Sequence, residues 1–503
     1  MKKMLLSLLL SAFTILLANA QGTIFSEEIE IPVGYQPQQI VLPPSPLTTQ
    51  VIFVGGVDLV QTTKTYGNEA SQQFAKEWHD FIGFTPDATG ASLGWVSVNH
   101  EMVYRDDRVG DGGGMTVFRV KRDVNGNLEI VEQTLEDGRK GKFFNVDFVN
   151  TVGETGMNCG GIVGPDGRIW TAEEWFQGSN RSVNTASMSG PTDSGSYPKG
   201  PGGASSANRA NQGVRDTADF VIKSDIPGFD GITIKKFENF NWMVEIDPRQ
   251  AKAIRKQYNW GKQGFEAGSI TNDNKTVYLG VDATPAFWGK FEADVAGDFT
   301  KGKLFVYKAS NPQGQRWVQI DNGSIDKMLN FDAQALAVGA TMYNRIEWTA
   351  IDRKTGKIYW TETGADGLGP LWSDDAANGG TYDPYHIARA TAKGLTGPGD
   401  ANYKDYYGRV WVYDPATNYN SVLIEGGPDW DQSTSPTEAN YPKKHLSNPD
   451  GLQVIEIDGK SFAVIEEDLN GISFGRMPAG ASRPVCEAWL LDLSIDNPTV
   501  DDL

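Results

Sequence analysis

The segment 354–362, Lys354-Thr-Gly-Lys-Ile-Tyr-Trp-Thr-Glu362, shows the pattern on which the prediction of the fold rests. A Thr-Gly turn leads into a short run of apolar and aromatic residues, and the run ends on a carboxylate. Such a run bounded by turn residues is typical of a β-strand. The same order of turn, strand and acid occurs in three further segments, 165–174, 272–282 and 458–468.

The spacing of these four strands indicates the architecture. They begin at Arg168, Lys275, Lys357 and Lys460, which is too irregular for a short solenoid repeat but suits propeller blades that carry insertions. No long amphipathic helical pattern dominates the chain. We therefore predict an all-β fold, a six-bladed β-propeller with long inter-strand insertions and about 80 residues in each blade.

The composition agrees with a large globular protein and excludes several classes. The chain has 503 residues, 14 of them Trp, and 11% are aromatic, which is far too many for a disordered chain. Two cysteines are too few for a fold stapled by disulfides. The net charge of −19, without a stripe of Lys or Arg, disfavours a nucleic-acid partner and makes metal cations the expected charged partners.

The first twenty residues have the pattern of a Sec signal peptide. Lys2 and Lys3 form a positive start, the run 5–17 is almost wholly apolar, and Ala18-Asn19-Ala20 is a small-residue cleavage signal. The run is shorter than the roughly 20 residues that span a bilayer, so a membrane anchor is the less favoured alternative. We expect a periplasmic or secreted protein whose mature part, 21–503, is one propeller domain without a transmembrane segment, most simply a monomer.

One stretch, 178–213, breaks the strand pattern. It consists mainly of Gly, Ser, Asn, Ala, Pro and Thr, and it has almost no large apolar residue with which to pack as a blade. We interpret it as an insertion in the single domain. Because it follows closely on Glu173 and Glu174, it either overhangs the mouth of the channel or is a passive surface excursion.

The acids at the strand ends predict a metal site. The innermost strands of a propeller run side by side along the central channel, so carboxylates at equivalent strand ends would meet at one mouth. Like charges crowded together are unfavourable unless a cation neutralises them. The alternative is that these acids only cap exposed strand ends.

Several common kinds of hydrolase site are missing from the sequence. The four histidines are scattered, no His-Glu-x-x-His occurs, and no Gly-x-Ser-x-Gly elbow occurs. Oxygen ligands must therefore do most of the work if the protein is an enzyme. They suit hard cations such as calcium and ferric iron, which also bind phosphate oxygens.

Six short motifs in a fixed order carry a resemblance to a known family. They are Asn99-His100-Glu101, Asn158-Cys159-Gly160-Gly161, Glu173-Glu174, Phe265-Glu266, Arg345-Ile346-Glu347 and Asn448-Pro449-Asp450-Gly451-Leu452. With these motifs the chain resembles the PhoX-type alkaline phosphatases, secreted bacterial β-propeller enzymes with an iron–calcium cluster. The resemblance extends from Asn99 to Asp468, which is most of the mature chain, and it implies hydrolysis of phosphomonoesters.

The resemblance also implies a set of ligands for Fe3+ and Ca2+. Cys159 matches the position whose thiolate ligates iron, although on the sequence alone it could be a buried small hydrophobe. The acids fall into three groups: Glu266, Glu347 and Asp450 for the iron pair, Glu101 and Glu174 for the calcium side, and Glu173 with Glu466-Glu467-Asp468 as further candidates.

Arg345 and Asn99 are expected to contact the substrate, a small-molecule phosphomonoester. Arg345 stands two residues before Glu347, and on a strand this spacing points both side chains to the same face. The guanidinium could clamp a phosphate there, or it could form only an ion pair with Glu347. Asn99 would be an uncharged donor to the phosphoryl group, and no side-chain nucleophile is required.

The sequence departs from the family pattern at three places. Lys2-Lys3 and the Leu-rich run suggest the Sec route rather than the twin-arginine route that family members commonly use. Phe265 stands where the family usually has a histidine, and Ile346 stands where it usually has a proline. The two replacements leave the candidate ligands in place, but they affect the expected range of substrates.

Two other functions stay open at this stage. A propeller with a single calcium ion could cleave lactones or inositol phosphates, as a lactonase or phytase does, and it would need neither iron nor Cys159. A non-catalytic propeller could use calcium for rigidity or for binding glycans. Cys159 and Cys486 could also pair in an oxidising compartment.

Overall fold

The computed structural model describes residues 49–64, 69–101, 112–174, 218–364, 369–427, 445–469 and 485–503. The predicted signal peptide, 1–20, and the predicted insertion, 178–213, lie outside these residues. The chain divides into two compact units, Met1–Val51 with Met477–Val485, and Ile52–Arg476 with Cys486–Leu503. Almost all of the described residues belong to the second, larger unit, and the elements below are those of that unit.

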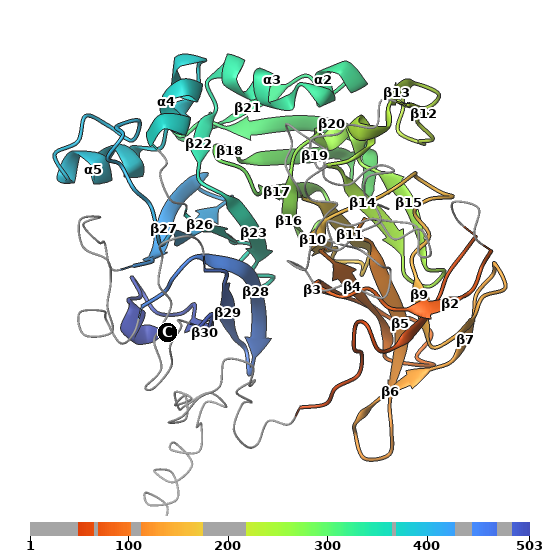
Figure 1. The fold of residues 1–503 in the computed structure, drawn as a ribbon. Helices are drawn as coiled ribbons and strands as arrows, with labels where there is room; N and C mark the ends of the chain where they lie inside the picture. The colour runs from red at the N-terminus through yellow and green to blue at the C-terminus, as the bar shows by residue number, and fades with distance from the viewer. Residues whose placement is uncertain are drawn as a thin grey trace, which may run out of the picture. The chain divides into compact units, whose positions relative to one another are not determined.

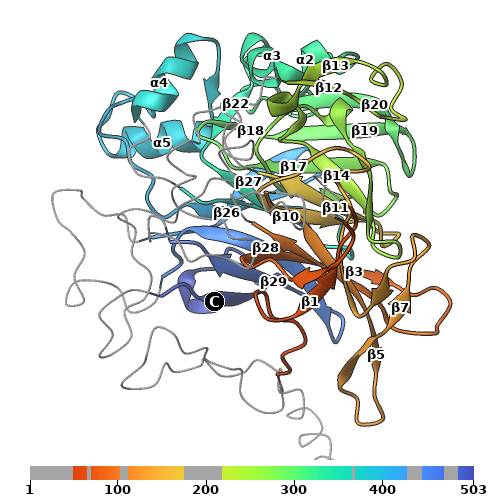
Figure 2. The same cartoon turned by 45° about the vertical axis from the view of Figure 1, so that its right-hand side comes forward.

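Sheets of mostly antiparallel strands make up the fold, as the all-β prediction expects (Figures 1 and 2). The first sheet has the strand order β2-β1-β9-β5-β4-β3, with β6 beside β5. Its strands are β1 (Leu59–Gln61), β2 (Gln72–Phe74), β3 (His79–Pro86), β4 (Gly94–His100), β5 (Met115–Arg122), β6 (Leu128–Val131) and β9 (Phe143–Asn145).

The second sheet has the order β10-β11-β14-β15, and the next two are joined through one residue pair, Val281 with Ile346. The strands of the second sheet are β10 (Asn158–Val163), β11 (Ile169–Glu173), β14 (Met243–Asp247) and β15 (Lys252–Lys256). The third contains β16 (Phe265–Ile270), β17 (Thr276–Val281), β19 (Gly289–Val295), β20 (Asp298–Tyr307) and β21 (Trp317–Ile320). The fourth contains β23 (Ile346–Ile351), β24 (Ile358–Glu362), β26 (Arg409–Asp414) and β27 (Tyr419–Glu425), and the fifth β28 (Pro449–Ile457), β29 (Lys460–Glu467) and β30 (Ala488–Asp492).

Short strands and helices connect these sheets. The short strands are β7 (Gln133–Thr134) with β8 (Lys140–Gly141), β12 (Asp219–Val221) with β13 (Thr233–Lys235), and β18 (Ala286–Phe287) with β22 (Thr341–Tyr343) and β25 (Thr381–Tyr382). The helices are α2 (Ile325–Leu329), α3 (Phe331–Val338), α4 (Gly369–Ala377) and α5 (Pro384–Ala392), with 3-10 turns η2 (Lys236–Asn239), η3 (Tyr258–Trp260) and η4 (Val500–Asp502). In the part of the chain that the structure describes, no helix has both the length and the apolar character to cross a bilayer.

One strand of each large sheet packs against the corresponding strand of the next. β3 packs against β10, β10 against β16, β16 against β23, and β23 against β28. Figure 1 shows β10, β16, β23 and β28 side by side. This is how the inner strands of consecutive propeller blades are arranged. We call each of the five sheets that start with these strands in the described residues a blade, and the closed propeller of six blades stays a prediction.

The four strands that the sequence predicted are present as β11, β17, β24 and β29. Each is the second strand of its sheet and pairs antiparallel with the inner strand. We expected these four strands to be the innermost strands of their sheets. This expectation was wrong, because each of them is the neighbour of the inner strand.

Tryptophan side chains fill much of the core, as the composition predicts. Trp170, Trp242, Trp260 and Trp288 are fully buried. The rings of Trp360 and Trp411 stack with centroids 5.0 Å apart and planes 2° apart. This packing gives the sheets a rigid support for the side chains at their strand ends.

Every inner strand carries a β-bulge at the same place. Its first residue pairs with the last residue of the second strand, and regular pairing resumes three residues later: His79 with His100, Asn158 with Glu173, Phe265 with Val281, Ile346 with Glu362, and Pro449 with Glu467. The second residue of each inner strand thus stands outside the ladder, in a bulge that can re-aim its side chain. These five residues are Asp80, Cys159, Glu266, Glu347 and Asp450.

The residue before the inner strand is also unusual in most blades. Trp78, Met157, Arg345 and Asn448 have φ angles of 55°, 45°, 60° and 50°, in the left-handed region that non-glycine residues rarely adopt. In four of the five blades, the bulge residue therefore follows one left-handed residue and one paired residue.

Candidate metal and phosphate site

The five bulge residues meet in space. Ligand atoms of Asp80, Cys159 and Glu266 lie within 4.8 Å of one another, and so do those of Glu266, Glu347 and Asp450. The two groups share Glu266, so the five side chains form one continuous set of possible ligands. The common position in the bulge explains why residues far apart in the sequence converge.

A second set of acids comes from the ends of the second strands. In each blade one residue follows the last paired residue of the second strand. From the first blade to the fifth, these residues are Glu101, Glu174, Asp282, Thr363 and Asp468. Ligand atoms of Glu101 and Glu174 lie within 4.8 Å of the Cys159 sulfur. We call the five bulge residues together with Glu101, Glu174, Asp282 and Asp468 the acidic cluster.

Cys159 sits between two carboxylates. Its Sγ lies 2.5 Å from Oε1 of Glu266 and 3.0 Å from Oδ2 of Asp80, and its single S–H can donate to either of them. Burial raises the pKa of this thiol well above its usual value, and the neighbouring acids raise it further. Cys159 and Cys486 are both free thiols, so the possible disulfide between them is not formed.

The acidic cluster has too little positive charge for its burial. Burial raises the pKa of Glu266 well above its usual value, and the charges of Glu174 and Glu347 raise it further. Burial likewise raises the pKa of Glu101 to about 8 and that of Asp80 to about 6. Crowded carboxyls of this kind hold protons unless cations replace them.

Two carboxylate oxygens in the acidic cluster are buried without a partner. Oε2 of Glu174 and Oδ1 of Asp450 accept no hydrogen bond from any described residue. An orphaned buried carboxylate oxygen is costly, and a cation would satisfy it. Carboxylates suit calcium and ferric iron, and the thiol of Cys159, once deprotonated, is a strong ligand for iron, so the donor set fits both metals.

Arg345 is the guanidinium that enters the acidic cluster. Its Nε donates to Oδ1 of Asp282 at 2.8 Å, and its Nη2 lies 2.7 Å from Oε1 of Glu347. Burial would raise the pKa of Asp282, but the charge of Arg345 together with the hydrogen bonds to Arg345 and Glu174 holds that pKa below its usual value. The ion pair with Glu347 that the sequence allowed is therefore present. The Nη1 group is buried and bonds to no described residue, which leaves a donor for a phosphate oxygen.

Asn99 contacts the backbone of the cysteine bulge. Its Nδ2 donates to the carbonyl oxygens of Cys159 and Gly160, both at 2.7 Å. Both amide hydrogens are therefore used to hold the backbone of the cysteine bulge. The expected role of Asn99 as a donor to the phosphoryl group stays a prediction, and it requires at least one of these two bonds to be given up.

Glu173 differs from its prediction as a metal candidate. Its Oε1 lies 2.7 Å from Nζ of Lys256, and its Oε2 accepts the N–H of Trp242 at 3.1 Å. Consecutive residues on a strand point to opposite faces, so Glu173 turns into its blade while Glu174 joins the acidic cluster. The same alternation turns Glu467 inward and leaves Asp468 beside the site.

Sequence reasoning missed Asp80 and Asp282 as site residues. Asp80 follows His79 just as Glu266 follows Phe265, as the second residue of an inner strand. Asp282 was read only as a strand-end acid. Aligning the inner strands on the acid or cysteine in second position would have found Asp80, because that position is shared by all five blades.

Comparison with known proteins identifies the family. The family model of the PhoX alkaline phosphatases matches residues 29–488. No curated protein matches the chain significantly. Among solved structures, PhoX of Pseudomonas fluorescens in complex with vanadate, a transition-state analogue, is similar with 18% identity and a TM-score of 0.51, over 83% of this chain and 78% of that one.

Two other solved structures are more distant. Hydrazine synthase of Kuenenia stuttgartiensis has 9% identity and a TM-score of 0.28, over 82% of this chain and 63% of that one. A gluconolactonase of Xanthomonas campestris has 9% identity and a TM-score of 0.24, over 86% and 97%. At these TM-scores neither bears on the fold. Because the family model spans nearly the whole chain, the protein belongs to the PhoX family of alkaline phosphatases, which are hydrolases of phosphate monoesters.

Proposed function

We propose that this protein is an exported phosphomonoesterase that releases inorganic phosphate from organic phosphate esters with an iron–calcium cluster. The observation that carries the proposal is the acidic cluster, in which the thiol of Cys159 lies between two carboxylates and buried carboxylate oxygens lack a partner. The proposal includes a six-bladed propeller, cleavage after Ala20 and a monomeric enzyme.

The side chains of the bulges are the proposed iron ligands. Cys159, Glu266, Glu347 and Asp450 supply one thiolate and three carboxylates, and Asp80 reaches the same thiol from the other side. Glu101 and Glu174 are the proposed calcium ligands, with Asp282 and Asp468 adding negative charge nearby. Bound iron and calcium would neutralise charge on the phosphate oxygens and activate an oxygen nucleophile.

Arg345 is the proposed phosphate-binding side chain. Asp282 and Glu347 fix its guanidinium from two sides, and Nη1 is left to donate to a phosphate oxygen. A guanidinium held in this way can stabilise the charge that develops on the equatorial oxygens in the transition state. Cys159 is not a nucleophile in this scheme, because a buried thiol with a raised pKa stays protonated or binds metal.

Elemental analysis of the purified mature protein tests the cofactor. We expect iron and calcium together, loss of iron in Cys159→Ala, and parental iron in the control Cys486→Ser, since Cys486 is an exposed free thiol. Calcium without iron would contradict the proposed cluster and would favour the propeller with a single calcium ion.

Kinetics with p-nitrophenyl phosphate test the activity. Glu347→Gln keeps the size of the side chain but removes the charge of a proposed iron ligand, so we expect kcat/KM to fall at least about a hundredfold. The parental rate in a folded Glu347→Gln protein would contradict the ligand assignment.

A further inference from the structure

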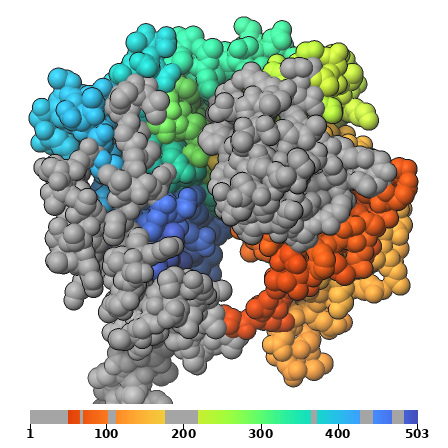
Figure 3. Space-filling view, in the orientation of Figure 1, coloured from red at the N-terminus to blue at the C-terminus, as the bar shows by residue number. Residues whose placement is uncertain are grey.

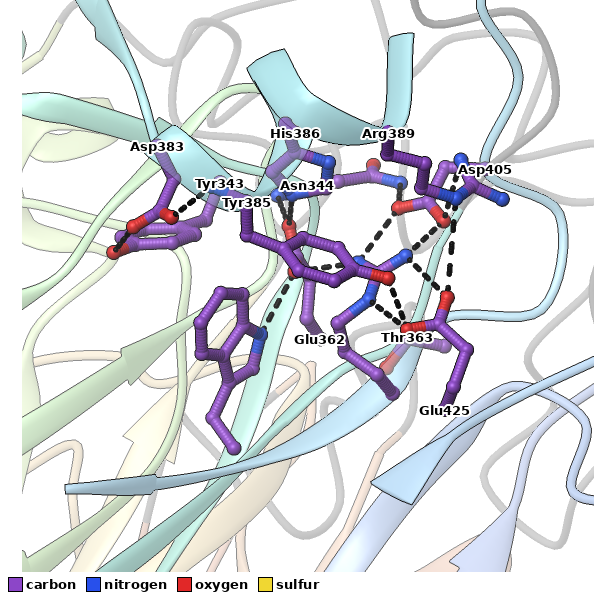
Figure 4. Close-up of polar contacts among 12 residues, drawn as sticks. Tyr343, Asn344, Glu362, Thr363, Asp383, Tyr385, His386, Arg389, Asp405 and Glu425 are labelled. Carbon is purple, nitrogen blue, oxygen red and sulfur yellow. Dashed lines mark hydrogen bonds and ion pairs between the residues drawn. The ribbon is translucent and has the colours of Figure 1, made fainter. Parts of the chain in front are cut away.

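A second group of buried charged side chains lies on the fourth blade, outside the acidic cluster (Figure 4). Glu362, His386 and Arg409 in this group are fully buried. The group connects the ends of three strands with helix α5. We call its members the arginine network: Glu362, His386, Arg389, Asp405, Arg409 and Glu425.

Glu362 is the centre of the arginine network. Its Oε1 accepts the backbone N–H of Asn344 at 2.9 Å and lies 2.9 Å from Nε2 of His386. Its Oε2 accepts from Nη1 of Arg409 at 2.6 Å and from Nε1 of Trp411 at 2.9 Å. The carboxylate is therefore saturated with four donors that come from three separate segments of the chain, since Arg409 and Trp411 both lie on β26.

Helix α5 is held by this network. It begins at Pro384, which suits a first turn, and Asp383 caps it by accepting the N–H of Tyr385. The α4 and α5 segment lies at the surface in Figure 3, but His386 points inward to Glu362, as Figure 4 shows. The helix thus contributes a buried contact that ends at the carboxylate of β24.

The arginine network is electrically complete without a metal ion. Glu362, His386 and Asp405 bring possible ligand atoms within 4.8 Å of one another, but Arg409 already contacts both carboxylates and would repel a cation. Burial raises the pKa of Glu362, yet the charges of His386 and Arg409 outweigh burial and hold this pKa below its usual value. The network therefore calls for an explanation other than metal binding.

The network reaches the phosphate side through Asn344. The N–H of Asn344 is held by Glu362, and its Oδ1 accepts the hydroxyl of Thr284 at 3.0 Å. The next residue is Arg345, whose backbone φ angle of 60° is costly for a residue other than glycine. Arg345 keeps this conformation because its neighbours fix the turn, and the conformation determines where its guanidinium points.

We propose that Glu362 is a positioning residue for Arg345: by holding the N–H of Asn344, it keeps Arg345 in the left-handed turn that places the guanidinium between Asp282 and Glu347. This inference rests on the proposed function, in which Arg345 binds the phosphate. Glu362 itself does not touch the substrate.

The fifth blade has the same contact without an arginine. The N–H of Ser447 donates to Oε1 of Glu467 at 2.8 Å, and the next residue, Asn448, has a φ of 50°. A strand-end glutamate that holds the turn before the inner strand is therefore a repeated device of this fold. In the fourth blade the device acts on a residue that faces the substrate.

A double-mutant cycle tests the proposal in the full metal-loaded enzyme. Glu362→Gln should lower kcat/KM for p-nitrophenyl phosphate about tenfold and weaken inhibition by inorganic phosphate, and Arg345→Ala should lower kcat/KM about a hundredfold. In the Arg345→Ala background, Glu362→Gln should cause less than about a twofold further loss, because the side chain that it positions is gone.

A merely structural role predicts a different result. The same proportional loss of kcat/KM from Glu362→Gln in both backgrounds would overturn the proposal. The matched control is Glu425→Gln, which belongs to the network but does not contact Asn344; its kcat/KM should stay within about twofold of the parent, and a tenfold loss there would also overturn the proposal.

Two further outcomes are distinguishable. If Arg345→Ala alone keeps the parental kcat/KM, the phosphate role of Arg345 fails, and with it the proposed function. If Glu362→Gln does not yield folded protein, Glu362→Asp carries the test, since it keeps the buried charge but shortens the side chain that reaches the N–H of Asn344. We expect a severalfold loss for Glu362→Asp that vanishes with Arg345→Ala, and additive losses would overturn the proposal.

Discussion

The acidic cluster and the arginine network are both buried groups of carboxylates at the strand ends, but their charge balance is opposite. In the acidic cluster, Arg345 is the basic side chain that the described residues provide, and burial raises the pKa of Glu266, Glu174 and Asp450 well above their usual values. In the arginine network, Arg389 and Arg409 contact the carboxylates, and the pKa of Asp405 lies below its usual value because these charges outweigh its burial.

This difference separates two reasons for burying acids. A compensated group such as the arginine network stabilises a particular geometry of the chain. An uncompensated group is unfavourable until cations enter it. Buried acids alone thus do not indicate a metal site. Buried acids that lack compensating positive charge do.

Metal removal should have the largest effect and should act on one group only. Stripping the metals with a chelator should lower kcat about a thousandfold or more, because the charge stabilisation that is lost amounts to several kcal/mol. Addition of iron and calcium should restore the rate. A stripped enzyme with the parental rate would show that the acidic cluster is not a catalytic metal site.

The same substitution in the two groups should change stability in opposite directions. Asp405→Asn leaves the buried Arg409 poorly compensated and should lower the free energy of unfolding by about 3 kcal/mol. Asp450→Asn, in metal-free protein, removes a carboxyl that must be protonated in order to be buried, and should raise the free energy of unfolding by about 1 kcal/mol. Denaturant titrations measure the free energy of unfolding of both variants. A change in the same direction for both would contradict the difference between the two groups.

The pH dependence of stability should also have opposite signs. In metal-free protein, Asp80 and Glu101 have folded pKa values raised to about 6 and about 8, so the folded state holds protons that the unfolded state has lost. Their contribution to stability is present at acid pH and is lost as the pH rises through those values. Unfolding midpoints between pH 5 and pH 9 should therefore fall in metal-free protein.

The arginine network responds at the other end of the pH scale. The folded pKa of Asp405 is lowered, so its contribution is present above its unfolded pKa of about 4 and is lost as the pH falls further. The stability difference between the parent and Asp405→Asn should shrink below about pH 4. A difference as large at pH 2 as at pH 6 would show that the charge of Asp405 is not what the network uses.

The smallest expected effect is at the rim of the arginine network. The hydroxyl of Tyr385 donates a short hydrogen bond to Oε2 of Glu425, and Tyr385→Phe removes it. The free energy of unfolding should fall by about 1 kcal/mol, with unchanged iron and calcium content. A change in metal content would indicate that the two groups are coupled more closely than the contacts imply.

Much of the fold could be predicted because the second strands have clear local signals. The turn at Lys354-Thr355-Gly356 and the run that follows it correspond to β24, which ends at Glu362 as the sequence indicated. The order of the strands within a sheet has no such signal. Both faces of β11 and β24 are buried, so their residues do not alternate between apolar and polar in a way that marks an inner strand.

The site was predicted where a motif fixes the geometry and missed where distant residues decide it. Arg345 and Glu347 contact each other as the motif predicts, although Arg345 lies in a left-handed turn just before β23 and Glu347 lies in its bulge. The side chain of Glu173 points away from the acidic cluster and pairs with Lys256. The amide of Asn99 donates to the carbonyl oxygen of Cys159, which lies beside it. Neither partner is adjacent in sequence, so no local pattern could reveal these contacts.

The repeated bulge has a consequence for when the site can form during folding. Its five side chains stand at positions 80, 159, 266, 347 and 450, each on a different blade. Closing such long loops costs entropy that is recovered only when the blades pack, so contacts of this kind form late. A chain that is still being synthesised offers single ligands and not the complete set. We therefore expect stable metal binding only after the last of these blades has packed against the others.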